Sequence, residues 1–157
     1  MKSQHKAFSM LTAIIVIVIM ATVAILILNV SGKIVKETTA QFQREQAMLL
    51  AKSYTEYAIM SVSANDRNST SNCLRDIDGN IGTNPSNGNG YRVRIRIAYI
   101  GNAAEVGSCA ATRTFSSSVT TPDTPLNIMI DAYVEYKNPD NPTGPWVTYH
   151  KRTLQKI

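Results

Sequence analysis

Few residues in this 157-residue chain have the types and spacing that catalysis requires. The only histidines are His5 and His150, which stand far apart in the sequence. The chain contains no His-Glu-x-x-His pair, no nucleophile elbow and no phosphate-binding loop. We therefore expect a protein that is not an enzyme and holds no cofactor, with His150 in a structural or surface role.

One short stretch has the composition of a metal site. Asp76-Ile-Asp78-Gly-Asn80 places oxygen ligands at alternate positions, as the start of a calcium loop does. An EF-hand would then need Gly at position 81 and Glu at position 87, where this chain has Ile81 and Asn87. We interpret the stretch as a turn and predict no metal site, with calcium binding as the alternative.

A stripe of arginines is the strongest candidate for a contact surface. In the segment Tyr91 to Ile100 apolar and polar residues alternate, which is typical of a strand with one buried face. Arg92, Arg94 and Arg96 share the polar face and could contact an acidic partner or a phosphate backbone. The alternative is a solvated sheet face, paired across strands with Asp131 or Glu135.

The charge balance does not favour nucleic acid as the partner. The whole chain carries a net charge of +5. Fourteen basic and eleven acidic side chains follow Gly32, so that part carries only +3, without a dense basic cluster.

The element that must position these residues is an apolar run from Phe8 to Val30. No Asp, Glu, Lys or Arg occurs from Ala7 through Gly32. A bilayer core requires about 20 apolar residues in a helix, so the run predicts a membrane span. Lys2 and Lys6 precede it, which places the N-terminus in the cytoplasm and the rest across the membrane. The alternatives are a cleaved secretory signal, whose apolar part is typically about 7–15 residues, and a buried core helix.

The helical pattern continues beyond the apolar run. No Pro or Gly occurs between Lys33 and Val62, and apolar residues recur there at three- and four-residue spacing. We expect one helix from Phe8 to Val62, about 80 Å long at 1.5 Å per residue. Gly32 is the one position where a kink or break is expected.

The remainder predicts a small sheet. Residues 64–90 are rich in Asn, Asp, Gly and Ser and predict a long loop. Clear strands are expected at 91–100, 126–137 and 146–154, with a short one within 109–117. The fold class is therefore α+β: a long N-terminal helix packed on a small antiparallel sheet of three to four strands. The expected segments are 1–7 (leader), 8–31 (membrane span), 32–63 (helix continuation) and 64–157 (globular head).

Cys73 and Cys109 both fall in the part that we expect to be exported. An oxidising compartment favours a disulfide between them, and two cysteines allow a single intramolecular pairing. Two free buried thiols are the alternative.

The junction at the start of the apolar run resembles a known signal. Ala7 precedes Phe8, a hydroxyl residue (Ser9) and a long apolar helix, as in the type IV filament superfamily of pilins and type II secretion pseudopilins. That resemblance covers about Lys6 to Val62. It implies that a prepilin peptidase cuts between Ala7 and Phe8 and methylates the new N-terminus, and that Phe8, Ser9 and Thr12 pack against other subunits. The fold of that family has the same order of parts.

Two positions depart from the family pattern. Gly usually precedes the cut, where this chain has Ala7. The fifth residue after the cut is usually a Glu that pairs with a neighbouring subunit's terminal amine, and here it is Thr12. Some minor pseudopilins at filament tips also lack this Glu, so Thr12 favours a minor subunit.

Three functions therefore remain open. The first, which we favour, is a minor pseudopilin or pilin-like subunit that supports protein export from the bacterial inner membrane, with its head in the periplasm. The second is a competence-type minor pilin that helps to take up DNA. The third is an unprocessed single-pass membrane protein with a periplasmic interaction domain.

Overall fold

The computed structural model describes the backbone of residues 4–65, 73–119 and 126–157, and side chains from Met10 onwards within those ranges. Helix α1 spans Gln4–Ala64. The chain forms two compact units, Met1–Phe42 and Gln43–Ile157. The predicted cut between Ala7 and Phe8 and the predicted packing of Ser9 fall in the first turns of α1, where the side chains lie outside the described residues.

The first unit contains the apolar part of α1 and extends to Phe42. It remains helical through Gly32, so α1 does not break at that glycine. Its large apolar side chains from Met10 to Val30 are between 49% and 74% exposed. The helix is long and apolar enough to cross a membrane, with a mean hydropathy of 3.2 in its most apolar window.

Hydroxyl side chains of α1 bond to its own backbone. Thr22 Oγ1 donates to the carbonyl oxygen of Ile19 at 2.8 Å, and Thr38 and Thr39 donate to carbonyls four residues back. Hydroxyls that are satisfied in this way do not interrupt the apolar surface.

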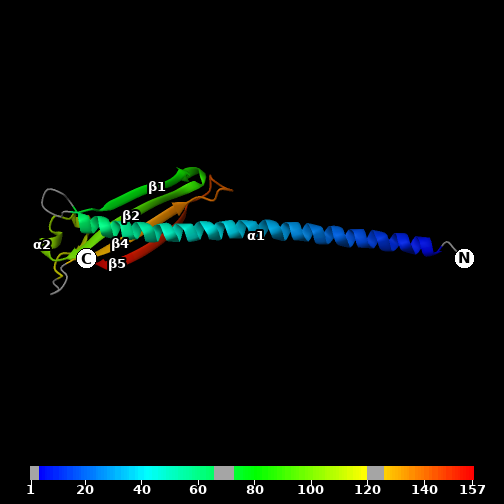
Figure 1. Ribbon diagram of the computed structural model, residues 1–157, viewed down its shortest axis with the longest axis horizontal. Helices are drawn as coiled ribbons and strands as arrows, with labels where there is room; N and C mark the ends of the chain where they lie inside the picture. The colour runs from blue at the N-terminus through cyan, green and yellow to red at the C-terminus, as the bar shows by residue number, and fades with distance from the viewer. Residues whose placement is uncertain (1–3, 66–72, 120–125) are drawn as a thin grey trace. The chain divides into compact units, whose positions relative to one another are not determined.

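In the second unit the last part of α1 packs on a five-stranded sheet. The strands lie in the order β1-β2-β4-β5, all antiparallel to their neighbours, and the short β3 pairs in parallel with the end of β2. Figure 1 shows these strands side by side along the green end of α1. Their bounds are β1 Asp76–Asn84, β2 Asn89–Gly101, β3 Thr114–Ser116, β4 Leu126–Tyr136 and β5 Val147–Lys156.

Three short helical turns connect these strands: η1 Pro85–Asn87, α2 Ala103–Val106 and η2 Ala111–Arg113. Asn102 caps α2, since its Oδ1 accepts a hydrogen bond from the amide of Glu105 at 3.0 Å.

The core lies between α1 and one face of the sheet. Small residues on α1 allow the helix to approach the sheet closely, and β-branched residues of β2 and β4 fill the layer between them. Its fully buried members include Ala47, Ala51, Ala58, Val62, Val93, Ile95, Ile97, Ile128, Ile130 and Val134. The predicted α+β class is confirmed, with the helix stripe and the two central strands where the periodicity placed them. The sheet has five strands rather than the predicted three to four, because β1 is added to them.

The interpretation of residues 64–90 as a loop was wrong from residue 76 onwards, and residues 66–72 of that range lie outside the described residues. Strand β1 occupies Asp76–Asn84 and pairs with β2 from Asp76 opposite Arg96 to Ile81 opposite Tyr91. Its composition is poor in strand formers, and the ladder to β2 outweighs that local preference. Ile77 and Ile81 turn toward the core, while the polar residues between them turn outward.

Candidate functional site

The arginine stripe lies on the sheet face opposite α1, where acidic side chains surround it. Arg92 Nε donates to Glu135 Oε2 at 2.6 Å, and Arg94 pairs with the other oxygen of Glu135. The Glu135 side chain is only 7% exposed, so its charge is largely shielded from water by these two guanidinium groups.

The third arginine of the stripe turns to β1 rather than β4. Arg96 Nη1 donates to Asp78 Oδ1 at 2.6 Å, and Arg96 Nε lies 3.4 Å from Asp76 Oδ1. The hydrogen bond with Asp78 raises the pKa of the Arg96 guanidinium. Asp76 also accepts from Arg113 Nη2 at 2.7 Å.

Glu135 is thus a partner of the stripe, as the sequence allowed, but Asp131 is not. Asp131 accepts two hydrogen bonds from Arg152 of β5, at 2.8 and 2.9 Å, and lies 2.7 Å from His150 Nε2. These contacts, that of Arg152 above all, hold the pKa of Asp131 below its ordinary value. The ring of His150 also stacks on Tyr133, with centroids 4.4 Å apart, which gives it a structural role on the sheet surface.

Together these residues form columns of alternating charge across the outer sheet face. The column on β1 is acidic, on β2 basic, on β4 acidic and on β5 basic. The register sets Asp76, Arg96, Asp131 and Arg152 in one row across the four strands. Neighbouring strands therefore attract one another through side chains as well as through backbone hydrogen bonds.

Sequence reasoning also missed Trp146, an aromatic member of this surface. The guanidinium carbon of Arg92 lies 4.4 Å from the centroid of the Trp146 ring, and Lys137 Nζ lies 5.3 Å from it. Cation–π contacts of this kind hold the start of β5 against the basic end of β2. No local pattern could have indicated this contact, because β2 and β5 are not neighbours in the sheet.

The segment considered as a calcium loop is part of β1. The carboxylates of Asp76 and Asp78 are paired with arginines, as given above. Over the part of the chain that the structure describes, no three His, Cys, Asp or Glu residues come together as metal ligands.

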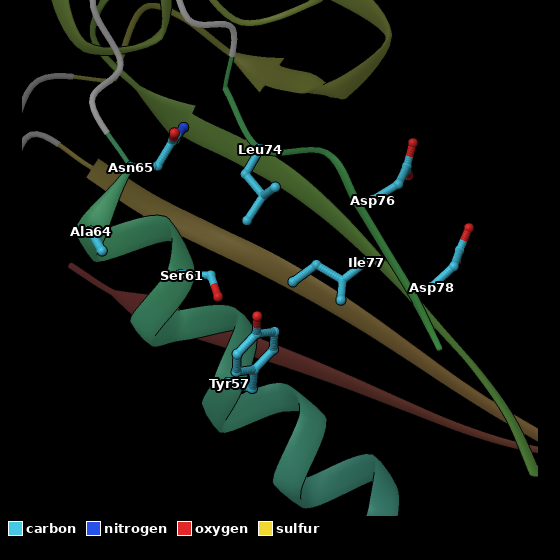
Figure 2. Close-up of a pocket in the computed structure, with 8 residues that line it drawn as sticks. All are labelled: Tyr57, Ser61, Ala64, Asn65, Leu74, Asp76, Ile77 and Asp78. Carbon is cyan, nitrogen blue, oxygen red and sulfur yellow. The ribbon is translucent and has the colours of Figure 1, made fainter. Parts of the chain in front are cut away.

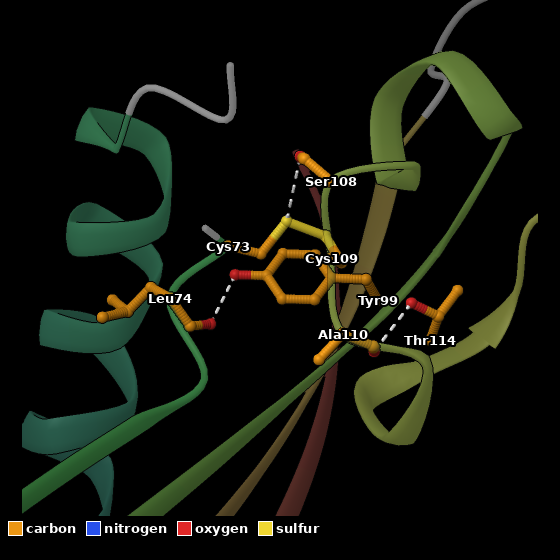
Figure 3. Close-up of a disulfide and its surroundings, with 7 residues drawn as sticks. All are labelled: Cys73, Leu74, Tyr99, Ser108, Cys109, Ala110 and Thr114. Atoms are coloured by element: carbon orange, nitrogen blue, oxygen red, sulfur yellow. Dashed lines mark hydrogen bonds between the residues drawn. A yellow bond between two sulfur atoms is a disulfide. The ribbon is translucent and has the colours of Figure 1, made fainter. Parts of the chain in front are cut away.

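The predicted disulfide is present and lies at one end of the sheet. Cys73 and Cys109 are bonded, with Cα atoms 4.9 Å apart (Figure 3). Beside the bond, the Tyr99 hydroxyl donates to the carbonyl oxygen of Leu74 at 2.6 Å, and Ser108 Oγ lies 3.7 Å from Cys73 Sγ. The bond ties the chain just before β1 to the segment that follows α2.

A groove runs between α1 and β1 within the second unit. One end is lined by Tyr57 and Ser61 of α1 and by Leu74 and Ile77 across from them (Figure 2). Figure 2 shows Ile77 pointing toward α1, while Asp76 and Asp78 point away from it. Further along, the groove is lined by α1 and β1 and by one residue of β2: Ser53, Tyr54, Leu49, Leu50 and Ile81, with Tyr91 of β2.

Comparison with known proteins leaves the family open. No protein-family model matches this chain, and we found no curated protein and no solved structure that matches it. The resemblance to pilin-like proteins therefore depends on the leader junction and on the helix-and-sheet architecture alone.

Proposed function

We propose that this chain is a minor pseudopilin or pilin-like subunit of a type II secretion or type IV filament system. The observation that carries the proposal is that the two parts of α1 have different surroundings. Its first part exposes an unbroken apolar surface from Met10 to Val30, and its last part, from Ala47 to Val62, packs on an antiparallel sheet. This division of one helix between an anchor and the core of a head is what a filament subunit requires.

The apolar surface of α1 would be covered both before and after such a subunit assembles into a filament. Each large aliphatic side chain left in water costs about 1.5–3 kcal/mol relative to burial, so the surface needs lipid or other apolar helices around it. Lipid would cover it before assembly, and helices of neighbouring subunits would cover it afterwards. Thr12 replaces the carboxylate with which the major subunits of that family pair, which supports a minor role.

Compartment and orientation follow from the same proposal. Lys2 and Lys6 would remain in the cytoplasm, and residues after Gly32 would lie in the periplasm of a bacterial inner membrane. The Cys73–Cys109 disulfide supports this placement, because such bonds persist in oxidising compartments. A prepilin peptidase and other pilin-like subunits would be its partners.

The geometry favours this function over DNA uptake. Each arginine of the stripe already pairs with Glu135, Asp76 or Asp78. A phosphate backbone would have to compete with those carboxylates, whereas nonspecific binding of nucleic acid depends on available positive charge.

The mature N-terminus, measured by mass spectrometry on protein from native membranes, tests the proposal. A chain that begins at Phe8 would support prepilin processing, and a charged Ala7→Glu variant should then keep its leader. A chain that retains residues 1–7 would contradict the proposal and favour the plain anchored protein. A start after Gly32 would overturn the membrane anchor as well.

A further inference from the structure

The sheet of the second unit ends in two open edges. Among the described residues, no strand pairs with the outer edge of β1 or with the outer edge of β5. Open edges present unpaired backbone amides and carbonyls, which can bond to a strand of another chain. Whether two edges fit one another depends on their backbone pattern, direction, charge and side-chain shape.

The backbone patterns of the two edges match. The amide of Ile97 donates to the carbonyl of Arg75 at 2.8 Å, so by antiparallel alternation the inward residues of β1 bond to β2. The backbone amides and carbonyls of Asp76, Asp78 and Asn80, whose side chains point outward, therefore face the open edge of β1 rather than β2. The amide of Ile157 donates to the carbonyl of Leu126 at 3.2 Å. By the same alternation, the outward residues of β5 direct their backbone amides and carbonyls to the open edge of β5.

The directions of the two edges also match. Three successive antiparallel pairings separate β1 from β5, so the two strands run in opposite directions. A second copy displaced sideways along the sheet, and rotated by its twist, therefore presents its β1 antiparallel to β5 of the first. No strand has to reverse, and both sheet faces stay aligned.

The charges on the two edges are opposite. The outward residues of β5 include Arg152, whose side chain is 57% exposed. The outward residues of β1 include Asp76 and Asp78, whose side chains are 43% and 60% exposed. Edges of one sign would repel, whereas these two would continue the alternation of acidic and basic columns that runs across the sheet.

Inward side chains of β5 suit the groove beside β1. Val147, Tyr149 and Lys151 point inward at alternate positions and are only partly covered within their own chain. The groove is apolar beside Leu49 and Ile81, rich in tyrosine at its middle and polar at the end lined by Ser61. Val147 would therefore face the apolar stretch, Tyr149 the tyrosine-rich stretch and Lys151 the polar end.

From these four agreements we propose that β5 of one copy pairs antiparallel with β1 of a second copy of this chain. The outward pairs are Arg152 with Asp76, His150 with Asp78, and Thr148 with Asn80 of the second copy. The inward pairs are Lys151 with Ile77, Tyr149 with Gly79, and Val147 with Ile81 of the second copy. The contact is head-to-tail, so each copy keeps one open edge.

The contact is small, since it involves only six residues of β5, which has ten, and six of β1, which has nine. Interfaces below roughly 1,000 Å² are weak between freely diffusing proteins, but anchoring both copies in one membrane raises their effective concentration. The pairing uses the head alone, so it holds whether or not the leader is cut at Ala7.

Cysteine cross-linking of the full chain in phospholipid vesicles tests the register. Thr148→Cys and Asn80→Cys are made in separate chains, reconstituted together and oxidised mildly. Both side chains are exposed, and residues opposed in a hydrogen-bonded antiparallel pair have Cα atoms about 5.5 Å apart, within disulfide reach. We expect a disulfide-linked dimer at least tenfold more abundant than with either variant alone.

The matched control keeps the same edges but shifts the register. Leu154→Cys, also exposed on β5, replaces Thr148→Cys in the mixture with Asn80→Cys. The proposal predicts little linkage, because these positions are six residues out of register. Equal linkage in this control, strong linkage with Thr148→Cys alone, or none in any mixture would overturn the proposal and leave the groove to a different partner.

A second pair of variants separates backbone pairing from side-chain contacts. In the Thr148→Cys chain, His150→Pro removes the amide that faces the second copy, and His150→Ala keeps it while losing the same ring contacts. Proline is tolerated where the amide of an edge strand faces outward. We expect His150→Pro to lower the yield of dimer at least fivefold relative to His150→Ala. Equal yields would contradict strand pairing.

Discussion

The hydroxyl of Tyr54 lies directly over Gly79, so close that a Cβ atom at Gly79 would be 2.7 Å from the hydroxyl oxygen. Tyr54 belongs to α1 and Gly79 to the middle of β1. The missing side chain on β1 is what admits the tyrosine ring between helix and strand. The contact lies in the groove between α1 and β1, and its fit can be tested by filling the space.

Gly79→Ala is expected to destabilise the head by about 1–3 kcal/mol, the usual range for an overpacked site. In a Tyr54→Phe background the penalty should be smaller, because the closest atom is gone. Urea unfolding of the full chain in detergent, followed by the fluorescence of Trp146, measures both. Additive effects of the two substitutions would show that the residues do not compete for this space.

Glu135→Ala is expected to destabilise the head by about 1–3 kcal/mol, because it leaves Arg92 and Arg94 without their shared carboxylate. The emission of Trp146 should also change, since Arg92 lies over its ring. Glu45→Ala, at an exposed position of α1, is the control and should move neither signal. An unchanged unfolding midpoint for Glu135→Ala would mean that the ion pairs contribute little.

Loss of the disulfide is expected to lower stability by about 2–4 kcal/mol, since the bond closes a loop between residues 36 apart. Cys73→Ser with Cys109→Ser should match reduced wild-type protein in thermal unfolding. Hydrogen exchange should rise most around Leu74, which Tyr99 also holds. Reductant should not change the double variant further, and a further change would indicate an effect unrelated to this bond.

Acid is expected to weaken the contact between β4 and β5. The folded-state pKa of Asp131 lies below its ordinary value of about 3.8, because Arg152 and His150 favour the ionised carboxylate. The stabilisation is therefore complete above that ordinary value and disappears as pH falls through the folded-state pKa.

Asp131→Asn should accordingly reduce stability at pH 7 and have progressively less effect as the pH falls below about 3.8. Unfolding midpoints of wild type and variant, compared across that range, give the measurement. Asp140→Asn, in the exposed loop before β5, serves as the control. A constant difference across pH would show that Asp131 acts through packing rather than charge.

Most of the fold could be predicted from local sequence patterns. The apolar run predicted a membrane-spanning helix, and the structure has a helix there that is long and apolar enough to span. The three- and four-residue spacing after it marked the face that α1 buries against the sheet. Strict alternation marked β2 and β4, because a half-buried strand repeats every two residues. The pairing of Cys73 with Cys109 required no geometry, since two cysteines can pair in one way only.

The same patterns did not predict β1. Its residues Asp, Asn and Gly favour turns when taken alone, and only Ile77 and Ile81 carry an apolar alternation. The strand forms because β2 pairs with β1 from Asp76 to Ile81 and because Tyr54 of α1 covers Gly79. Contacts distant in sequence thus override local propensity.

The sequence by itself determined that a long apolar helix precedes a small sheet, since periodicity and composition are local properties of the chain. Which charges meet was decided only by the tertiary structure. The sequence offered both Asp131 and Glu135 to the arginine stripe, and the strand register gave Glu135 to Arg92 and Arg94 and left Asp131 to Arg152. Register depends on the pairing of strands far apart in the chain, and no local pattern encodes it.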